Sequence, residues 1–299
     1  MSNTKTMIAV LVALFGALML GLMAVFMYKA DKEPLSSTVF SGTVTDLDGN
    51  AIKGAKLHIL RYHRIRTVSR QQGEYEISWD ASKLPESHDI YIIARHEEKN
   101  LAAATKVRPD TQTHNITLLS AVTATGTVTD SNGNPIENAA VYFGFTAEKG
   151  YITSFAERSR FAADSRGIYK VPFIPPKNRY SVSLHAEGYG SKSISVNTDD
   201  AVDGVLELGA AALSKADQAI SGVVVDLDGN PVPNVQIFRK SEGQPSGYKE
   251  TDADGRFTIA VCKGNVVLSA VVRKDGTMLV GRAEAASGTE DLKIVLEPR

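Results

Sequence analysis

Paired acidic residues recur at three places in this chain of 299 residues. Each place has the form Asp-x-(Asp/Asn)-Gly-Asn, and its polar members are Asp46 and Asp48, Asp130 and Asn132, or Asp226 and Asp228. Carboxylates at this spacing occur in calcium loops, where Ca²⁺ takes roughly six to eight oxygen ligands. The position of the bidentate glutamate of an EF-hand holds an apolar residue in all three copies. We therefore expect tight turns whose aspartates accept backbone hydrogen bonds, with weak calcium binding at Asp46, Asp48, Asp226 and Asp228 as the alternative.

Aromatic and arginine side chains alternate in one long connection. The connection from Gly133 to Gly167 is longer than its counterpart from Gly49 to Gly73, and its added stretch contains Tyr151, Phe155, Arg158 and Arg160. Loops on a rigid scaffold often carry binding residues, and arginine and aromatic residues dominate binding hot spots. These four residues are our candidate binding surface. The alternative is an extended hairpin that packs its aromatic residues on its own sheet.

Histidine and cysteine do not form a recognisable metal site. The histidines concentrate in the first part of the chain, at His58, His63, His88, His96 and His114. No pair has a zinc-site spacing and no cysteine lies nearby, so we expect these histidines to face solvent. Cys262 is the single cysteine and lies in an apolar stretch, where a free cysteine packs as a small hydrophobic residue.

Signatures of a self-contained enzyme do not occur in the sequence. There is no Gly-x-Ser-x-Gly nucleophile motif and no glycine-rich loop for phosphate. The formal net charge of −1 gives no reason to expect a nucleic-acid partner. We expect a protein that is not an enzyme, with no catalytic residue, no cofactor and no resident metal.

The elements that position these side chains repeat along the chain. The motif Gly-x-Val-x-Asp-x-(Asp/Asn)-Gly-Asn begins at Gly42, Gly126 and Gly222, with spacings of 84 and 96 residues, which suit three small domains. Apolar residues alternate with polar residues around each motif, as in strands with one buried face. The predicted inward residues are Phe40 and Val44, Ala124 and Val128, and Ile220 and Val224, followed by Leu57, Val141 and Ile237. Short strands between regular turn signals predict an antiparallel β-sandwich in each repeat.

A second motif follows each turn and identifies a resemblance. The run G-x-V-x-D-x-x-G-x-P followed by T-D-x-x-G-x-(Y/F)-x-(I/V) is most complete at 222–235 and 251–259, and the second repeat adds Ala186-Glu187-Gly188-Tyr189. These motifs resemble the carboxypeptidase regulatory-like domain, a transthyretin-like (prealbumin-like) β-sandwich, in three tandem copies over residues 38–299. The first copy departs most, with Ala51 where the others have proline. The resemblance implies a fold more than a function, because such domains accompany many unrelated proteins. The His-x-x-Glu zinc pair of the peptidases that these domains accompany is absent from the sequence.

The N-terminal region contains one long apolar segment. Residues from Met7 to Tyr28 include no charged side chain, and about 20 such residues cross a bilayer as a helix. A cleaved signal peptide is the alternative, but bulky Leu22 and Tyr28 occupy positions where a cleavage site needs small residues. We expect an uncleaved anchor with the N-terminus in the cytoplasm and the rest of the chain exported.

The predicted fold class is therefore all-β: three tandem antiparallel β-sandwiches, transthyretin-like or Ig-like, after an N-terminal transmembrane helix. The predicted organisation is a short tail 1–6, a transmembrane helix 7–28, a linker 29–37, and repeats at 38–119, 120–213 and 214–299.

The expected function is non-catalytic: a single-pass membrane-anchored, extracytoplasmic structural or binding protein. It would be periplasmic or on the cell surface, with a protein or glycan of the cell envelope as its partner. A carbohydrate-binding module is one alternative. The other is an accessory or regulatory subunit of a separately encoded envelope enzyme.

Overall fold

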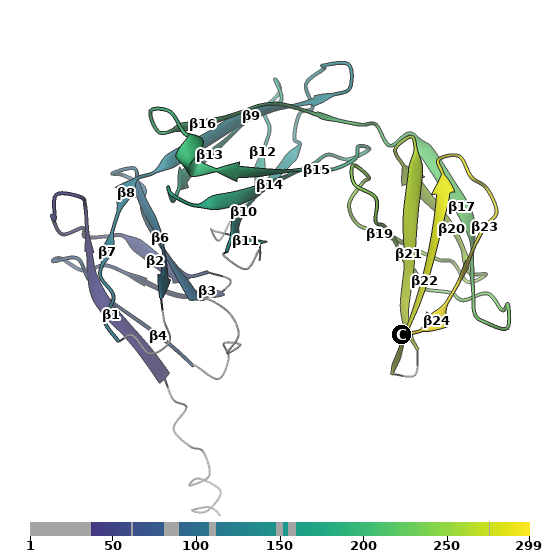
Figure 1. Cartoon of the computed structure of the whole chain (residues 1–299), viewed down its shortest axis with the longest axis horizontal. Helices are drawn as coiled ribbons and strands as arrows, with labels where there is room; N and C mark the ends of the chain where they lie inside the picture. The colour runs from purple at the N-terminus through teal and green to yellow at the C-terminus, as the bar shows by residue number, and fades with distance from the viewer. Residues whose placement is uncertain are drawn as a thin grey trace, which may run out of the picture.

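The computed structural model describes residues 37–60, 62–80, 90–107, 112–147, 152–154, 160–274 and 276–299. These residues form six sheets that pack as three pairs, each with a three-stranded and a five-stranded member. The pairs follow one another along an arch, and the middle pair lies between the other two (Figure 1). We call them the N-terminal, middle and C-terminal sheet pairs. Strands and turns make up the described residues apart from one short 3-10 helix, so the all-β fold class is confirmed. The division into three domains at residues 38–119, 120–213 and 214–299 stays a prediction.

The N-terminal sheet pair joins the sheets β4-β1-β7 and β3-β2-β5-β6-β8. Its strands are β1 (Ser37–Thr45), β2 (Lys56–Ile59), β3 (Tyr62–Val68), β4 (Glu74–Asp80), β5 (Ile90–His96), β6 (Leu101–Val107), β7 (Ile116–Thr117) and β8 (Leu119–Ser120).

The middle sheet pair joins the sheets β13-β9-β16 and β11-β10-β14-β15, and β12 also pairs with β10. Its strands are β9 (Val122–Asp130), β10 (Ala140–Thr146), β11 (Ile152–Ser154), β12 (Arg160–Ala162), β13 (Ile168–Ile174), β14 (Arg179–His185), β15 (Lys192–Asn197) and β16 (Val205–Leu213). A 3-10 helix, Thr198–Asp200, follows β15.

The C-terminal sheet pair joins the sheets β20-β17-β23 and β19-β18-β21-β22-β24. Its strands are β17 (Gln218–Val225), β18 (Gln236–Arg239), β19 (Tyr248–Glu250), β20 (Arg256–Val261), β21 (Asn265–Lys274), β22 (Thr277–Ala286), β23 (Leu292–Val295) and β24 (Glu297–Pro298).

The predicted buried faces are confirmed. The inward residues of the first strands are fully buried, namely Phe40, Val44, Ala124, Val128, Ile220 and Val224. The aromatic residue two positions after each second-motif glycine is also buried in a core, namely Tyr75, Tyr169 and Phe257. Burial of one such side chain stabilises the folded state by about 1.5–3 kcal/mol, which explains why apolar residues alternate with polar residues in all three copies.

The opening glycines of the three motifs lie where neighbouring atoms leave no open space for a side chain. A Cβ atom on Gly42 would overlap the carbonyl oxygen of His114, and one on Gly222 would overlap that of Leu292. On Gly126 it would lie 2.5 Å from the Oη atom of Tyr169. Backbone atoms exclude a side chain at Gly42 and Gly222, whereas at Gly126 the ring of Tyr169 would have to shift to admit one. The motif glycine therefore reflects close packing at all three positions.

One part of the predicted topology is wrong. The sandwiches are not purely antiparallel, because β1 pairs with β7, β9 with β16 and β17 with β23 in parallel. The last strand of each small sheet returns from the other sheet by a crossover and enters beside the first strand in the same direction. An alternating pattern of apolar and polar residues shows which face of a strand is buried. It does not show whether neighbouring strands run parallel or antiparallel.

The expectation that the histidines face solvent is wrong for His58, which is 8% exposed. His58 lies opposite Ile93 on β5, and Ile93 belongs to the core of the middle sheet pair together with Leu60 and Tyr91. The five-stranded sheet of the N-terminal pair is therefore covered on both faces. His58 does point to the outer face of its sheet, as the alternating pattern predicts. Part of that outer face, however, packs on the middle sheet pair.

Within the described ranges no helix is long and apolar enough to cross a membrane. The predicted anchor, Met7–Tyr28, lies outside the described residues.

Candidate functional site

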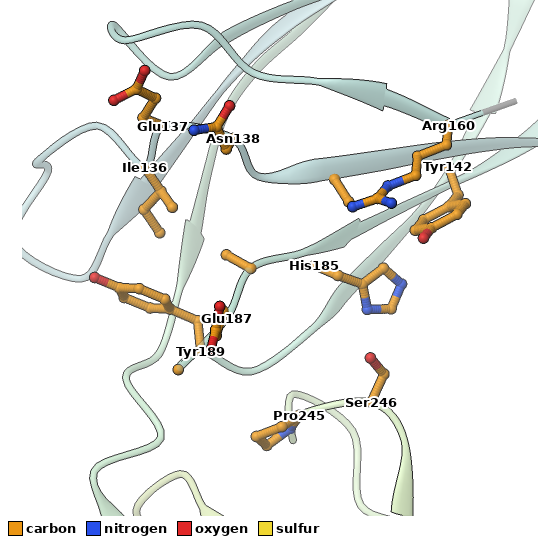
Figure 2. A pocket seen from close by; sticks show the side chains of 13 residues that line it. Ile136, Glu137, Asn138, Tyr142, Arg160, His185, Glu187, Tyr189, Pro245 and Ser246 are labelled. Atoms are coloured by element: carbon orange, nitrogen blue, oxygen red, sulfur yellow. The ribbon is translucent and has the colours of Figure 1, made fainter. Parts of the chain in front are cut away.

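A pocket of about 670 Å³ opens on the outer face of the five-stranded sheet of the middle sheet pair. Strands β10, β12 and β14 and the turns before β10 and after β14 supply most of its lining, and a loop of the C-terminal sheet pair supplies the rest. In Figure 2, Pro245 and Ser246 of that loop lie across from His185 and Tyr189. The pocket therefore depends on residues from two successive sheet pairs.

Strand register brings three of the lining side chains together. Tyr142 on β10 pairs with Arg160 on β12, and His185 on β14 pairs with Ala140 on β10. The rings of Tyr142 and His185 meet edge to face, with centroids 5.4 Å apart and an interplanar angle of 77°. Because the neighbours of Tyr142 on β10 point into the core, Tyr142 itself points outward and is 42% exposed.

His185 has an unsatisfied polar atom. Its Nδ1 atom is buried and has no hydrogen-bond partner in the part of the chain that the structure describes. An unpaired buried polar atom costs about 1–3 kcal/mol, and ordered water or a ligand normally satisfies it. Burial lowers the pKa of His185 from its ordinary value of 6.5. The imidazole is therefore neutral at neutral pH and can either donate or accept a hydrogen bond.

The polar lining is mixed in charge. Glu137 and Glu187 contribute carboxylates, Asn138 contributes an amide, and Arg160 contributes a guanidinium. Tyr189, from the turn that follows β14, adds a second aromatic side chain. Aromatic faces beside hydrogen-bonding groups of both kinds suit a ligand with apolar faces and several hydroxyl or amide groups.

The two walls of the pocket are tied to each other. Ser191, just after the turn that carries Tyr189, donates two hydrogen bonds to the carbonyl oxygen of Gln244: from its N atom at 3.1 Å and from its Oγ atom at 2.8 Å. Gln244 is 7% exposed, and its Oε1 atom accepts a 2.8 Å hydrogen bond from the N atom of Cys262. These contacts fix the loop of Pro245 and Ser246 against the middle sheet pair, so the pocket is preformed.

Cys262 packs as predicted, because it is buried with 3% exposure. Its Sγ atom lies 3.4 Å from the carbonyl oxygen of Ser214, across the same seam between the middle and C-terminal sheet pairs. Burial raises the pKa of this thiol, which keeps it protonated and unreactive.

Only part of the predicted binding surface can be placed. Arg160 lines the pocket, whereas Tyr151, Phe155 and Arg158 lie outside the described residues. The sequence prediction missed Tyr142 and His185. Tyr142 could have been found, because it lies between two predicted inward residues and must face outward. The position of His185 could not, because only the register of β14 on β10 brings it to this face.

The aspartate motifs form the predicted turns. The Oδ1 atom of Asp46 accepts hydrogen bonds from the N atoms of Asp48 at 3.1 Å and Asn50 at 2.8 Å, and its Oδ2 atom accepts one from the Nδ2 atom of Asn50 at 3.1 Å. Asp130 and Asp226 repeat this pattern. The hydrogen bonds from Asn50 hold the pKa of Asp46 below its ordinary value.

These hydrogen bonds occupy both carboxylate oxygens of each first aspartate, which favours the turn over calcium binding. Across the described ranges, no cluster of three or more histidine, cysteine, aspartate or glutamate residues could hold a metal ion.

Residues 123–208 match the family model of the carboxypeptidase regulatory-like domain. The matched segment coincides with the second repeat of the sequence motif, and it carries most of the pocket. The sequence motifs had pointed to the third copy as the most complete. For the first and third repeats, membership of this family stays a prediction.

Several solved structures, among them two pilins, are similar to the chain at low identity. The Bacillus anthracis TIE protein is 14% identical over 88% of this chain and 51% of its own, with a TM-score of 0.27, so the chain spans about half of that structure. A streptococcal ancillary pilin is 12% identical over 88% of this chain and 100% of its own, with a TM-score of 0.30. BcpA, the major pilin subunit of Bacillus cereus, is 8% identical over 88% of this chain and 100% of its own, with a TM-score of 0.24. At these identities and TM-scores the matches carry no argument about function.

Proposed function

We propose that this chain is a non-catalytic binding protein. A membrane helix at residues 7–28 anchors it, and its sheet pairs lie outside the cytoplasm. Its binding site is the pocket between the middle and C-terminal sheet pairs, and its partner is a protein or glycan of the cell envelope. The three sheet pairs, three copies of the carboxypeptidase regulatory-like domain in this proposal, hold that pocket away from the bilayer.

One observation carries the proposal: an exposed aromatic side chain, Tyr142, lies beside a buried histidine nitrogen that lacks a hydrogen-bond partner in the described structure. A ligand that covers Tyr142 and supplies one hydrogen bond to His185 would offset the cost of that unpaired atom. Ser191 and Gln244 already fix the walls, so binding requires no loop movement. Only the His185 side chain has to turn to present its buried Nδ1 atom. Preformed walls reduce the ordering entropy that binding costs.

A glycan is the partner that the pocket lining favours. Sugar rings present one apolar face and several hydroxyl groups, which match the aromatic side chains of Tyr142 and Tyr189 and the polar groups of Asn138 and Arg160. The carbohydrate-binding alternative therefore has a specific observation behind it. The alternative of an accessory enzyme subunit has none.

Binding can be tested on a glycan array with the full-length chain and two matched pairs of variants. Tyr142→Ala and Arg160→Gln should each weaken binding about tenfold, because each removes roughly 1.4 kcal/mol of contact energy. Leu47→Ala and Arg282→Gln change exposed residues of the N-terminal and C-terminal sheet pairs and should bind as the wild type does. Binding that is equal in all four variants would refute the assignment of the pocket.

The location is tested separately by protease treatment of intact cells that carry an epitope after Arg299. Loss of the epitope while a cytosolic control survives would support a surface location. Loss only after the outer barrier is permeabilised would support a periplasmic one. Protection until the inner membrane is lysed would overturn the extracytoplasmic proposal.

A further inference from the structure

We infer that a second pocket, at the seam between the N-terminal and middle sheet pairs, binds an anionic group, either a phosphate or a carboxylate carried by a hydroxylated polymer. This pocket shares no lining residue with the pocket described above. The inference does not depend on the proposed function.

The second pocket has a volume of about 670 Å³ and a positive lining. Its charged and amide residues are Lys106, Lys177, Asn178, Arg179, Asn197 and Asp199. Three of these side chains are cationic and one is a carboxylate, in a chain whose formal net charge is −1. Positive charge is thus concentrated here against the average of the molecule. Convergent cations on a concave surface attract anions and raise their local concentration.

Strand register explains how the charges converge. Arg179, at the start of β14, pairs with Asn197 on β15 on one side and with Thr146 on β10 on the other. Lys106 pairs with Tyr91 across β5 and β6 of the N-terminal sheet pair. Lysine and arginine therefore reach the seam from two different sheet pairs.

The seam that holds these charges is firmly packed. The rings of Tyr91 and Phe145, one from each sheet pair, lie 5.0 Å apart at 59°. Both side chains are almost fully buried, with 7% and 1% exposure. Aromatic contacts of this kind contribute about 0.5–1.5 kcal/mol beyond the burial of their area. They fix Lys106 relative to Arg179 before any ligand arrives.

The loop that presents Lys177 is also held in place. Thr198 is 3% exposed; its Oγ atom accepts a 2.9 Å hydrogen bond from the N atom of Asn178 and donates one of 3.0 Å to the carbonyl oxygen of the same residue. The side-chain amide of Asn178 donates a 2.6 Å hydrogen bond to the carbonyl oxygen of Pro176. Tyr180 donates a 2.7 Å hydrogen bond from its Oη atom to the carbonyl oxygen of Pro175.

Lys177 itself has a φ of 59°, in the left-handed region that residues other than glycine seldom adopt. Such a conformation persists only where the surroundings enforce it, and it is often found in functional loops. The network around Thr198 supplies that enforcement. Lys177 and Arg179 are therefore presented by a rigid loop rather than by a free surface segment, which lowers the entropy cost of binding.

Asp199 opposes the positive charge only in part. Its Oδ2 atom accepts a 3.2 Å hydrogen bond from the Nδ2 atom of Asn197. The side-chain amide of Asn197 donates to Asp199 and that of Asn178 donates to Pro176, and the second N–H of each amide can donate to a hydroxyl oxygen. An anionic group on a hydroxylated polymer uses both features of the lining, the cations and the amides.

The test measures binding of three polymers to the full-length chain by isothermal titration calorimetry: polygalacturonate for carboxylates, polyphosphate for phosphates and neutral dextran. We expect binding of one or both polyanions that weakens with added salt, and no binding of dextran. The double variant K177Q/R179Q should bind the polyanion at least tenfold more weakly than the wild type. The double variant R282Q/K293Q removes the same charge from exposed positions of the C-terminal sheet pair and should lose less than twofold.

Asp199→Asn should strengthen polyanion binding, a gain that a damaged fold would not produce. Preference for polygalacturonate over polyphosphate, or the reverse, would identify the anionic group, and either supports the inference. Absence of binding to both polyanions, binding of dextran with equal affinity, or equal losses in the two double variants would overturn it.

Discussion

Substitution of Gly222 by alanine should separate two strands of the C-terminal sheet pair. A Cβ atom at this position would lie 2.7 Å from the carbonyl carbon of Leu292 and 2.9 Å from its N atom, and it would overlap the carbonyl oxygen. All three obstacles are backbone atoms, so no side-chain rotation can relieve them. Strand β23 must therefore move away from β17 along the parallel ladder that runs from Gly222 and Leu292 to Val225 and Val295.

The expected loss of stability follows from what that movement breaks. Two ladder hydrogen bonds contribute about 1 kcal/mol each, and partial exposure of Ile294, which is 1% exposed, costs about 1 kcal/mol more. The sum is about 3 kcal/mol, local to one sheet pair. Amide hydrogen exchange followed by mass spectrometry measures this loss of local stability. A loss of about 3 kcal/mol should speed amide exchange in β17 and β23 by roughly a hundredfold. Exchange in β9 and β13 should not change.

Gly229→Ala is the matched control. Gly229 has a φ of 85°, close to the 82° of its counterpart Gly49, and no atom lies within 4 Å of the added Cβ. Its cost is the backbone strain alone, about 1 kcal/mol, and exchange should rise less than tenfold. Wild-type exchange in Gly222→Ala, or equal effects of the two substitutions, would refute the close-approach explanation of the motif glycines.

Two further predictions concern buried polar groups. Tyr75→Phe should destabilise the N-terminal sheet pair by about 1 kcal/mol in hydrogen exchange, because it removes a 2.6 Å hydrogen bond from the Oη atom to the carbonyl oxygen of His114. Tyr169→Phe should be neutral or stabilising, because the buried Oη atom of Tyr169 has no partner among the described residues; equal losses in both variants would contradict this reasoning. Burial lowers the pKa of His185 in the folded state. Below about pH 6.5 the unfolded chain therefore binds more protons than the folded chain. The contribution of neutral His185 to stability is complete above that pH, and it is lost as the pH falls toward the lowered pKa of the folded state. Thermal unfolding of His185→Gln between about pH 5 and about pH 7.5 should show a weaker pH dependence than the wild type, and an unchanged dependence would show that His185 is not the group responsible.

The sequence predicted well what depends on one strand and its own sandwich. Phe40 and Val44 alternate with polar neighbours because one face of their strand meets a core, and both are fully buried. The aspartate of each turn is similarly local, because Asp46 hydrogen-bonds only within the next four residues. Such features need no knowledge of distant partners.

Features that depend on distant partners were not predictable in this way. His58 has the pattern of an outward residue, and its burial comes from a second sheet pair that packs on that face. The parallel pairing of Val44 with Ile116 depends on a crossover through the other sheet. Tyr142 and His185 meet because of register, which no spacing between them in the sequence reveals.

The two pockets show why a pocket between two sheet pairs cannot be found by studying one repeat of the sequence alone. The cationic pocket needs Lys106 from the N-terminal sheet pair and Arg179 from the middle one. The pocket around Tyr142 needs Ser246 from the C-terminal sheet pair. The seams also differ in kind, because aromatic packing closes the first, whereas hydrogen bonds to Gln244 close the second. The sandwiches thus repeat their turns and their inward strand positions, while each seam is built from residues that the repeats do not share. The first seam is also continuous with a core, because Tyr91 and Phe145 belong to the same buried cluster.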